Sequence, residues 1–218
     1  MWILNLFSEK PILFNVFAKT DRILSFILFF SYDSYSQTAQ EYFDNAKKKS
    51  YKFRSSKAIE NYNKAIELDS TFAEAYYYRG LLKSYQLFDF TGAIEDFTKA
   101  IELDFSELTD AYTERGIAKA SLADNISGGT AKYFKLDSGS IADYTKAIEL
   151  DPEFVDAYYY RGIRKYDLED YEASIEDFTK AIELYGNGKT GENLSSILTF
   201  TGPYVYRGRA KVELEDYN

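Results

Sequence analysis

The sequence contains no cysteine and no histidine. The missing cysteine excludes disulfides, thiol catalysis and zinc–thiolate sites, and the missing histidine excludes histidine-dependent catalytic triads and every imidazole metal site. Enzymatic chemistry is thereby narrowed to carboxylates and hydroxyls, and no pattern of these singles out a catalytic residue. We therefore expect a protein that is not an enzyme, with no catalytic residue, no metal site and no cofactor.

Proline and glycine are also scarce, at 3 and 12 of 218 residues, which favours a helical protein. The chain is 45% hydrophobic and 28% charged, so it should fold rather than stay disordered. Its formal net charge is −9, and the one basic run, residues 47–49, is interpreted as a solvated helix face. An acidic chain without a basic cluster is a poor binder of nucleic acid, so we expect no nucleic-acid partner.

The first 36 residues differ in composition from the rest. Lys19 and Arg22 precede an apolar run over residues 23–30, and small residues follow at Ser34 and Ser36. A basic flank, a short apolar core and a small-x-small exit are typical of a secretory signal, here cleaved near Ser36. The run is well short of the roughly 20 residues of a membrane-spanning helix. We expect an exported mature chain, periplasmic or secreted, without a stable membrane span; a retained leader would instead leave the protein cytoplasmic or membrane-associated.

From residue 39 onward the sequence resembles itself. The letters KAIEL recur around Ala65, Ala100, Ala147 and Ala181, at intervals of 35, 47 and 34 residues. A self-similar period of this size indicates a solenoid of small repeats. Within each unit the apolar residues have helical spacing, and no stretch alternates as a strand does. The pattern predicts tandem pairs of helices, and in one unit these run roughly over residues 72–87 and 92–103.

Two sequence signals mark where first helices should begin. Thr71 and Glu74 form a capping-box pattern, which predicts that a helix starts at Thr71. Asp151 precedes Pro152, which is the order of an N-cap followed by a first-turn proline. We therefore expect helices to begin at these two places.

The residues of these units resemble a known repeat. Tyr158-x-x-Arg161-Gly162, followed by Ser174-x-x-x-Phe178-x-x-Ala181, is similar to a tetratricopeptide repeat (TPR), and the other units match in the same way. The resemblance covers about residues 39–218, and it departs from the family where arginine replaces the usual leucine before glycine. It implies an all-α fold, an α–α superhelix, in which antiparallel helix pairs form a right-handed solenoid. The expected division is a leader over 1–36 and a solenoid over 37–218, with repeats at 39–72, 73–108, 109–154 and 155–188 and the first helix of a fifth at 201–218.

The arginine before each glycine should have a buried partner. An aspartate precedes the aromatic residue of the second helix in three units, while the first unit has asparagine at both positions. We predict structural ion pairs in which each arginine reaches such an aspartate of the same or the preceding unit. The arginines are Arg79, Arg115, Arg161 and Arg207, and the aspartates are Asp96, Asp143 and Asp177. The alternative, an anion site lined by the four arginines, is the less favoured interpretation.

Two units carry insertions. The interval from Gly116 to Ile141 is 25 residues, against 14 from Gly80 to Ile94. A second insertion of similar size separates units four and five, and insertions in solenoids usually form loops. The sequence ends where unit five would begin a second helix. Either its first helix caps the solenoid, or the sequence is a fragment of a longer protein.

The resemblance also implies where a ligand would bind. In the family, first helices line a concave groove that holds extended or helical peptides, and the matching residues here are Tyr77, Leu81, Thr113, Ile117, Tyr159, Ile163 and Tyr166. Acidic residues stand nearby, and the lysine, asparagine and arginine that grip a carboxylate in some family members are replaced. An aromatic groove with an acidic rim favours an apolar or basic segment of a protein or peptide partner. We expect a non-catalytic interaction module. The alternatives are the N-terminal repeat region of a longer envelope enzyme or sensor, and an envelope scaffold that self-associates through its last helix.

Overall fold

The computed structural model describes residues 37–50, 55–125, 131–188 and 196–216 of the chain. Over these ranges the chain forms nine helices and no strand. In chain order they are α4 (Ala39–Ser50), α5 (Ser55–Leu68), α6 (Ala73–Tyr85), α7 (Phe90–Glu102), α8 (Leu108–Asp124), α9 (Ala131–Leu150), α10 (Val155–Asp167), α11 (Tyr171–Gly186) and α12 (Ser196–Asp216).

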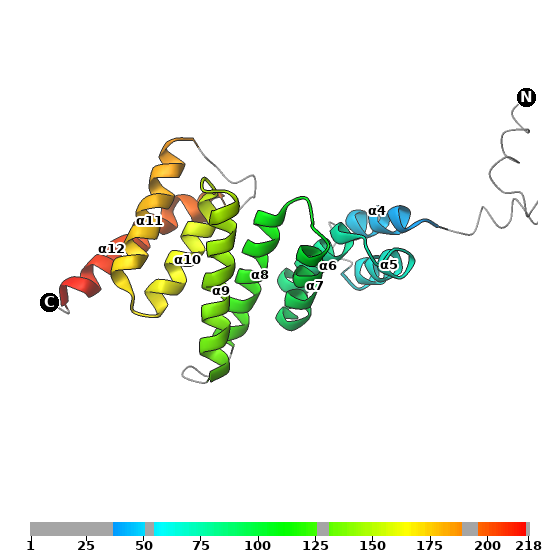
Figure 1. Ribbon diagram of the computed structural model, residues 1–218, viewed down its shortest axis with the longest axis horizontal. Helices are drawn as coiled ribbons and strands as arrows, with labels where there is room; N and C mark the ends of the chain where they lie inside the picture. Colours follow the sequence, from blue (N-terminus) through cyan, green and yellow to red (C-terminus); the bar gives the residue numbers. More distant parts are fainter. Residues whose placement is uncertain (1–36, 51–54, 126–130, 189–195, 217–218) are drawn as a thin grey trace, which may run out of the picture.

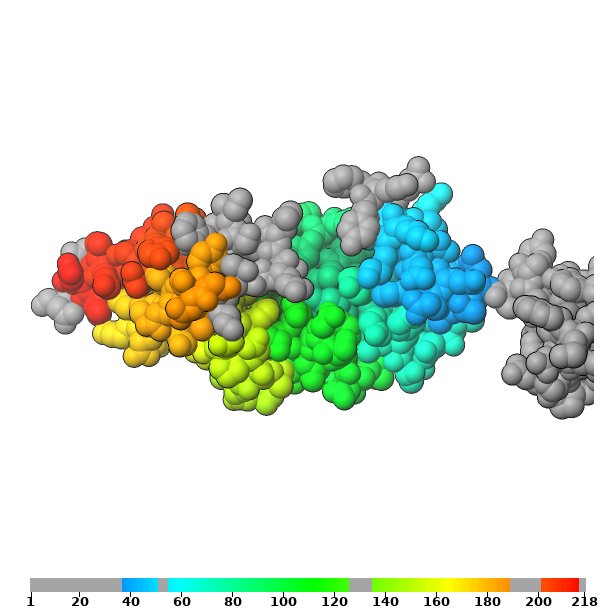
Figure 2. Space-filling view, turned by 90° about the horizontal axis from the view of Figure 1, so that it is seen from above, coloured from blue at the N-terminus to red at the C-terminus, as the bar shows by residue number. Residues whose placement is uncertain are grey.

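The helices stack in pairs along one long axis, from α4 at one end to α12 at the other (Figure 1). Each helix contacts the next along the chain, and the first helices of successive pairs, α4, α6, α8, α10 and α12, also contact one another. The space-filling view shows the resulting elongated array (Figure 2). The all-α solenoid expected from the sequence is confirmed, and one of its surfaces is formed by first helices.

The glycine of each first helix provides a notch for an aromatic ring of the second. A Cβ atom added to Gly80, Gly116 or Gly162 would lie 2.8, 2.6 or 2.8 Å from the nearest ring atom, which is closer than real Cβ atoms come. The rings belong to Phe97, Tyr144 and Phe178, each at most 1% exposed. The helix propensity that glycine forfeits, about 1 kcal/mol against alanine, is offset by this close packing of helix on helix.

Both predicted capping residues are wrong, although α6 begins within one residue of the expected start and α10 begins three residues beyond it. The N-caps of α6 and α10 are Phe72 and Phe154, and neither makes a side-chain cap hydrogen bond. Asp69 and Asp151 instead each accept a hydrogen bond, 2.9 Å long, from the backbone amide two residues on. An aspartate bonded in this way stabilises a turn. The N-cap follows each of these aspartates by three residues, at Phe72 and Phe154. The capping-box pattern at Thr71 therefore belongs to a loop.

The second helices do begin at aspartate caps. Asp89 accepts a hydrogen bond from the amide of Gly92 at 3.0 Å, and Asp170 accepts one from Ala173 at 3.3 Å. These bonds satisfy amides that lack a partner within the helix. They fix where α7 and α11 start relative to the first helices that they cover.

The insertion in unit three lengthens helices rather than forming one long loop. α8 has 17 residues and α9 has 20, against 13 in each of α6 and α7. The turn added to α8 is packed, with Ala123 0% exposed. The expectation of a loop of about a dozen residues is therefore wrong, because burial of these turns offsets the entropy of ordering them. The segments 126–130 and 189–195 lie outside the described residues.

The expected leader, residues 1–36, also lies outside the described residues. Within the described ranges, no helix combines the length and the apolar character needed to cross a membrane. The export prediction accordingly rests on the sequence.

Candidate functional site

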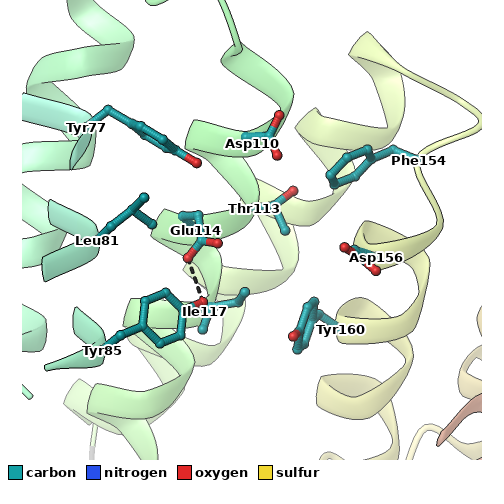
Figure 3. A pocket seen from close by; sticks show the side chains of 10 residues that line it. All are labelled: Tyr77, Leu81, Tyr85, Asp110, Thr113, Glu114, Ile117, Phe154, Asp156 and Tyr160. Carbon is teal, nitrogen blue, oxygen red and sulfur yellow. Dashed lines mark hydrogen bonds between the residues drawn. The ribbon is translucent and has the colours of Figure 1, made fainter. Parts of the chain in front are cut away.

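A cavity of about 390 Å³ lies between three successive first helices. Figure 3 shows its side chains pointing toward one another from α6 on one side, from α10 on the other and from α8 between them. α6 contributes Tyr77, Leu81 and Tyr85; α8 contributes Asp110, Thr113, Glu114 and Ile117; and the start of α10 contributes Phe154, Asp156 and Tyr160.

Helical spacing explains why these side chains face one space. Residues three or four apart share a helix face, and the α6 contributors stand four apart. The α8 contributors likewise recur at steps of three and four, and Asp156 and Tyr160 of α10 stand four apart. Because α6, α8 and α10 are stacked side by side, their three faces join into one concave surface (Figure 3).

The cavity is acidic, and its carboxylates are poorly solvated. Burial raises the pKa of Glu114 to about 7, and the neighbouring charges of Asp110 and Asp156 add to the rise. Burial likewise raises the pKa of Asp156 to about 6, again with a contribution from Asp110. The Oη of Tyr85 donates a hydrogen bond of 2.8 Å to Glu114, which opposes the rise by favouring the charged carboxylate. The electrostatics of the cavity thus favour a positive charge, either a proton or a cationic ligand.

The aromatic walls are held in place by stacking. The ring of Tyr77 lies 4.5 Å from that of Phe105 at an interplanar angle of 24°, and Tyr77 is only 6% exposed. The ring of Tyr160 stacks on Tyr144 at 6.0 Å and 21°. Rings fixed in this way offer apolar contact area and negative faces without further loss of side-chain entropy.

Four of the seven predicted groove residues line this cavity, namely Tyr77, Leu81, Thr113 and Ile117. The predicted groove residues Tyr159 and Tyr166 are not among the residues that line this cavity. Their rings lie 6.4 and 5.8 Å from the ring of Tyr206, so α12 packs against them. Ile163 is half-buried and is not among the lining residues.

Sequence reasoning did not select Tyr85, Phe154 or Tyr160, and it treated Glu114 only as a replacement for a carboxylate-gripping residue. Tyr85 stands one helical turn beyond Leu81, so continued helical spacing could have found it. Phe154 and Tyr160 reach the cavity from the start of α10, and their position depends on how α10 packs on α8. Spacing within one helix carries no signal for that.

The structure brings three of the four predicted arginines onto aspartates. Nε and Nη2 of Arg79 donate to the two carboxylate oxygens of Asp96 at 2.9 and 2.6 Å. Arg115 binds Asp143 in the same bidentate way at 3.0 and 2.7 Å, and Arg161 binds Asp177 at 2.9 and 2.7 Å. The aspartate side chains are only 4 or 5% exposed, so these pairs are buried. Each pair joins the two helices of one unit.

The remaining guanidinium nitrogen joins the unit to the one before it. Nη1 of Arg79 donates to Asn63 at 2.7 Å, Nη1 of Arg115 to Thr98 at 3.2 Å and Nη1 of Arg161 to Thr145 at 3.1 Å. Each acceptor lies on the second helix of the preceding unit. One arginine therefore ties three helices together, which is a structural role and not an open anion site.

A lysine one turn after each arginine shares the same aspartate, and the sequence had not suggested it. Lys83 contacts Asp96 at 2.8 Å, Lys119 contacts Asp143 at 2.7 Å and Lys165 contacts Asp177 at 2.8 Å. Two cations thus converge on one buried carboxylate in each of three units. The two cations offset the free-energy cost of burying a carboxylate between packed helices.

Arg207 of α12 departs from this pattern. Its Nη1 lies 3.4 Å from the hydroxyl of Thr179 on α11, and its guanidinium lies 5.8 Å from the ring centre of Tyr204. Both contacts have counterparts in the earlier units. The predicted aspartate is not among its contacts in the described part of the chain. Across those same ranges, no group of three or more acidic side chains is arranged to hold a metal ion.

Comparison with known families identifies the repeat. The TPR repeat description matches residues 54–84, and the tetratricopeptide repeat description matches residues 73–107 and 155–187. The chain is a tetratricopeptide-repeat protein. No curated protein matches this TPR chain.

Solved structures share the same solenoid. MamA is 25% identical and superposes with a TM-score of 0.59, over 69% of this chain and 80% of that one. A thermophilic TPR protein of Thermus thermophilus is 14% identical, with a TM-score of 0.61 over 83% of this chain and 88% of that one. YrrB, described as a TPR protein with an unusual peptide-binding site, is 19% identical, with a TM-score of 0.59 over 85% and 86%. At these identities the last two show the fold alone.

Proposed function

We propose that this TPR protein is a non-catalytic interaction module whose cavity between α6, α8 and α10 binds a basic side chain of a protein or peptide partner. One observation carries the proposal. Three carboxylates converge in the cavity, and the pKa values of Glu114 and Asp156 are raised to about 7 and about 6. A cation placed among them offsets both the burial and the mutual repulsion that raise those values.

The walls suit the rest of a lysine or arginine side chain. Leu81 and Ile117 offer apolar contact to an aliphatic stem, and the rings of Tyr77 and Tyr160 can face a cationic head. The volume, about 390 Å³, is at the small end of ligand pockets, which span about 300–1,000 Å³. It therefore suits one or two anchoring side chains, with the remainder of the partner lying along the first-helix surface.

The class of ligand has support from a similar fold. YrrB, which has the same solenoid fold, is described as a TPR protein with an unusual peptide-binding site. Tandem helix pairs form a concave surface wherever they stack, and extended concave surfaces are what repeat proteins use to bind partners. The chemistry of the anchor is proposed from the residues of this chain alone.

A peptide selection tests the proposal. A displayed library of random peptides is selected at pH 8 on the wild-type protein and on a Glu114→Gln, Asp156→Asn variant. The control variant is Glu176→Gln, which changes an exposed carboxylate on α11 away from the cavity. We expect wild type and control to enrich the same sequences containing lysine or arginine, and the cavity variant to lose them. Enrichment of sequences without basic residues, or equal recovery by the cavity variant, would refute the proposal.

We also propose that the protein is exported. The support is the composition of residues 1–36, with a basic flank, an apolar run at 23–30 and small residues at Ser34 and Ser36. A partner in the cell envelope or outside the cell follows from that proposal, whereas the binding mode does not depend on it.

A further inference from the structure

The cavity between α6, α8 and α10 receives no counter-charge from the helices that form it. Every lysine and arginine of these three helices is paired with an aspartate that does not line the cavity. Glu114 accepts a hydrogen bond from the hydroxyl of Tyr85, which is a neutral donor. The positive charge that the carboxylates favour is therefore left for a ligand to supply.

Aromatic rings face the cavity from two sides. Tyr77 and Tyr85 belong to α6, and Phe154, the N-cap of α10, and Tyr160 stand across from them. Figure 3 shows the carboxylates of the cavity among these four rings. The face of an aromatic ring attracts a cation, and a cage of several rings is a characteristic protein site for an alkylated ammonium group.

We propose that the cationic side chain bound in this cavity is a dimethylated lysine of the partner. This inference rests on the proposed function and specifies its ligand. The two methyl groups would contact the aromatic walls, and the remaining N–H would donate to Glu114 or Asp156. The aliphatic stem would lie along Leu81 and Ile117, which also line the cavity.

The aromatic walls favour a methylated head over a bare ammonium. A lysine ammonium is compact and strongly hydrated, and each of its three N–H donors needs an acceptor once water is removed. A guanidinium carries five N–H donors and needs still more acceptors. Methyl groups replace donors with apolar surface, which gains dispersion contacts with the rings. They also fill more of a cavity of about 390 Å³ than a bare ammonium does.

The carboxylates favour a head that keeps one proton on its nitrogen. A single N–H can donate to Glu114 or Asp156, and a hydrogen bond between two charged groups is stronger than one between neutral groups. A trimethylated head has no N–H and would leave both carboxylates without a donor from the ligand. Dimethyllysine is the form that meets both the rings and the carboxylates.

The test compares ligands on the full chain. The probes are fluorescent peptides with one lysine between alanine and glycine residues, in unmodified, dimethyl and trimethyl forms, and the same peptide with arginine. Binding is followed by anisotropy at pH 8, above the raised pKa values of Glu114 and Asp156, about 7 and about 6. Free N,N-dimethylbutylamine is then used as a competitor, because it carries the same head without a peptide.

Two protein variants locate the preference. Tyr85→Leu removes one ring of the cage, and it should fold because Tyr85 is 51% exposed. The matched control is Phe88→Leu, which removes a ring that is 72% exposed and does not line the cavity. Circular dichroism should show the same helix content for both variants and wild type.

We expect the dimethyl peptide to bind at least fivefold more tightly than the unmodified and arginine peptides, and more tightly than the trimethyl peptide. Tyr85→Leu should reduce the dimethyl preference at least threefold, and Phe88→Leu should leave it unchanged. Tightest binding by any other peptide, or an unchanged preference in Tyr85→Leu, would overturn the inference and leave the proposed function standing. Free amine that competes with the affinity of the dimethyl peptide would also overturn it, by identifying a small amine as the ligand. Absence of saturable binding by all four peptides would overturn both.

Discussion

The space beside each glycine predicts that a Gly→Ala substitution changes the stability of the protein in opposite directions at Gly208 and Gly162. Alanine in place of glycine within a helix stabilises by about 1 kcal/mol through helix propensity alone. At Gly208 nothing opposes that gain among the described residues, so Gly208→Ala should stabilise the chain by about 1 kcal/mol. At Gly162 the new Cβ would lie 2.8 Å from Cε1 and 3.0 Å from Cδ1 of Phe178.

The ring of Phe178 cannot readily yield. It is 0% exposed, and its other face stacks on Tyr206 at 5.6 Å. Forcing an extra carbon into a packed core typically costs about 1–3 kcal/mol. Set against the propensity gain of about 1 kcal/mol, Gly162→Ala should be neutral to destabilising by about 2 kcal/mol. The difference between the two variants, about 1–3 kcal/mol, then measures the steric contact alone.

Both variants should be measured by urea unfolding, followed by far-UV circular dichroism. Because repeats unfold partly independently, amide hydrogen exchange within α10 and α11 should report the change at Gly162 directly. Gly186→Ala, at the exposed end of α11, serves as a control for the general effect of removing a glycine. If Gly162→Ala stabilised the chain as much as Gly208→Ala did, the ring would not occupy the notch as described.

Three further predictions concern charge and processing. Asp177→Asn should destabilise by about 3 kcal/mol, since it leaves two partly buried cations without their carboxylate. The exposed neighbour change Glu176→Gln should stay within about 0.5 kcal/mol, and equal thermal shifts for the two variants would contradict the prediction. The pKa of Glu114 is raised to about 7, so between pH 4.5 and 7 the folded state holds a proton that the unfolded state releases. The free energy of unfolding should therefore fall by up to about 3 kcal/mol as pH rises from 4.5 to 7. A Glu114→Gln variant with the same pH profile as wild type would refute this prediction. The exported protein should begin near Gln37, and mass spectrometry that found residues 1–36 still attached would reject the signal assignment.

The features that the sequence predicted correctly are those set by spacing within one repeat. Glycine and the ring that fills its notch recur together, so stacked helix pairs could be inferred from one chain. The link between arginine and aspartate was visible because both positions change to asparagine in the first unit. The lysine that shares each aspartate recurs just as regularly in the sequence. It was missed because a lysine at that spacing is equally consistent with a solvent-exposed helix face. The predicted capping residues failed because Asp69 and Asp151 accept hydrogen bonds from local amides in turns, and the sequence does not rank a turn against a cap.

The cavity was only half predictable, for a different reason. Tyr77 and Leu81 follow from the family's groove positions, but Tyr159, which matches Tyr77, packs against Tyr206 of α12 instead of lining the cavity. Whether a first-helix face is open depends on how the next unit approaches it. That approach cannot be read from spacing within one helix.

The charge of the groove follows from how the stack is built. The helices α6, α8 and α10 each turn an arginine and a lysine toward their second helix, where one aspartate binds both. Those cations are therefore committed to the interior, while α8 and α10 turn carboxylates toward the cavity. Burial and the charge of Asp110 consequently raise the pKa of both Glu114 and Asp156, and a cationic ligand is favoured there.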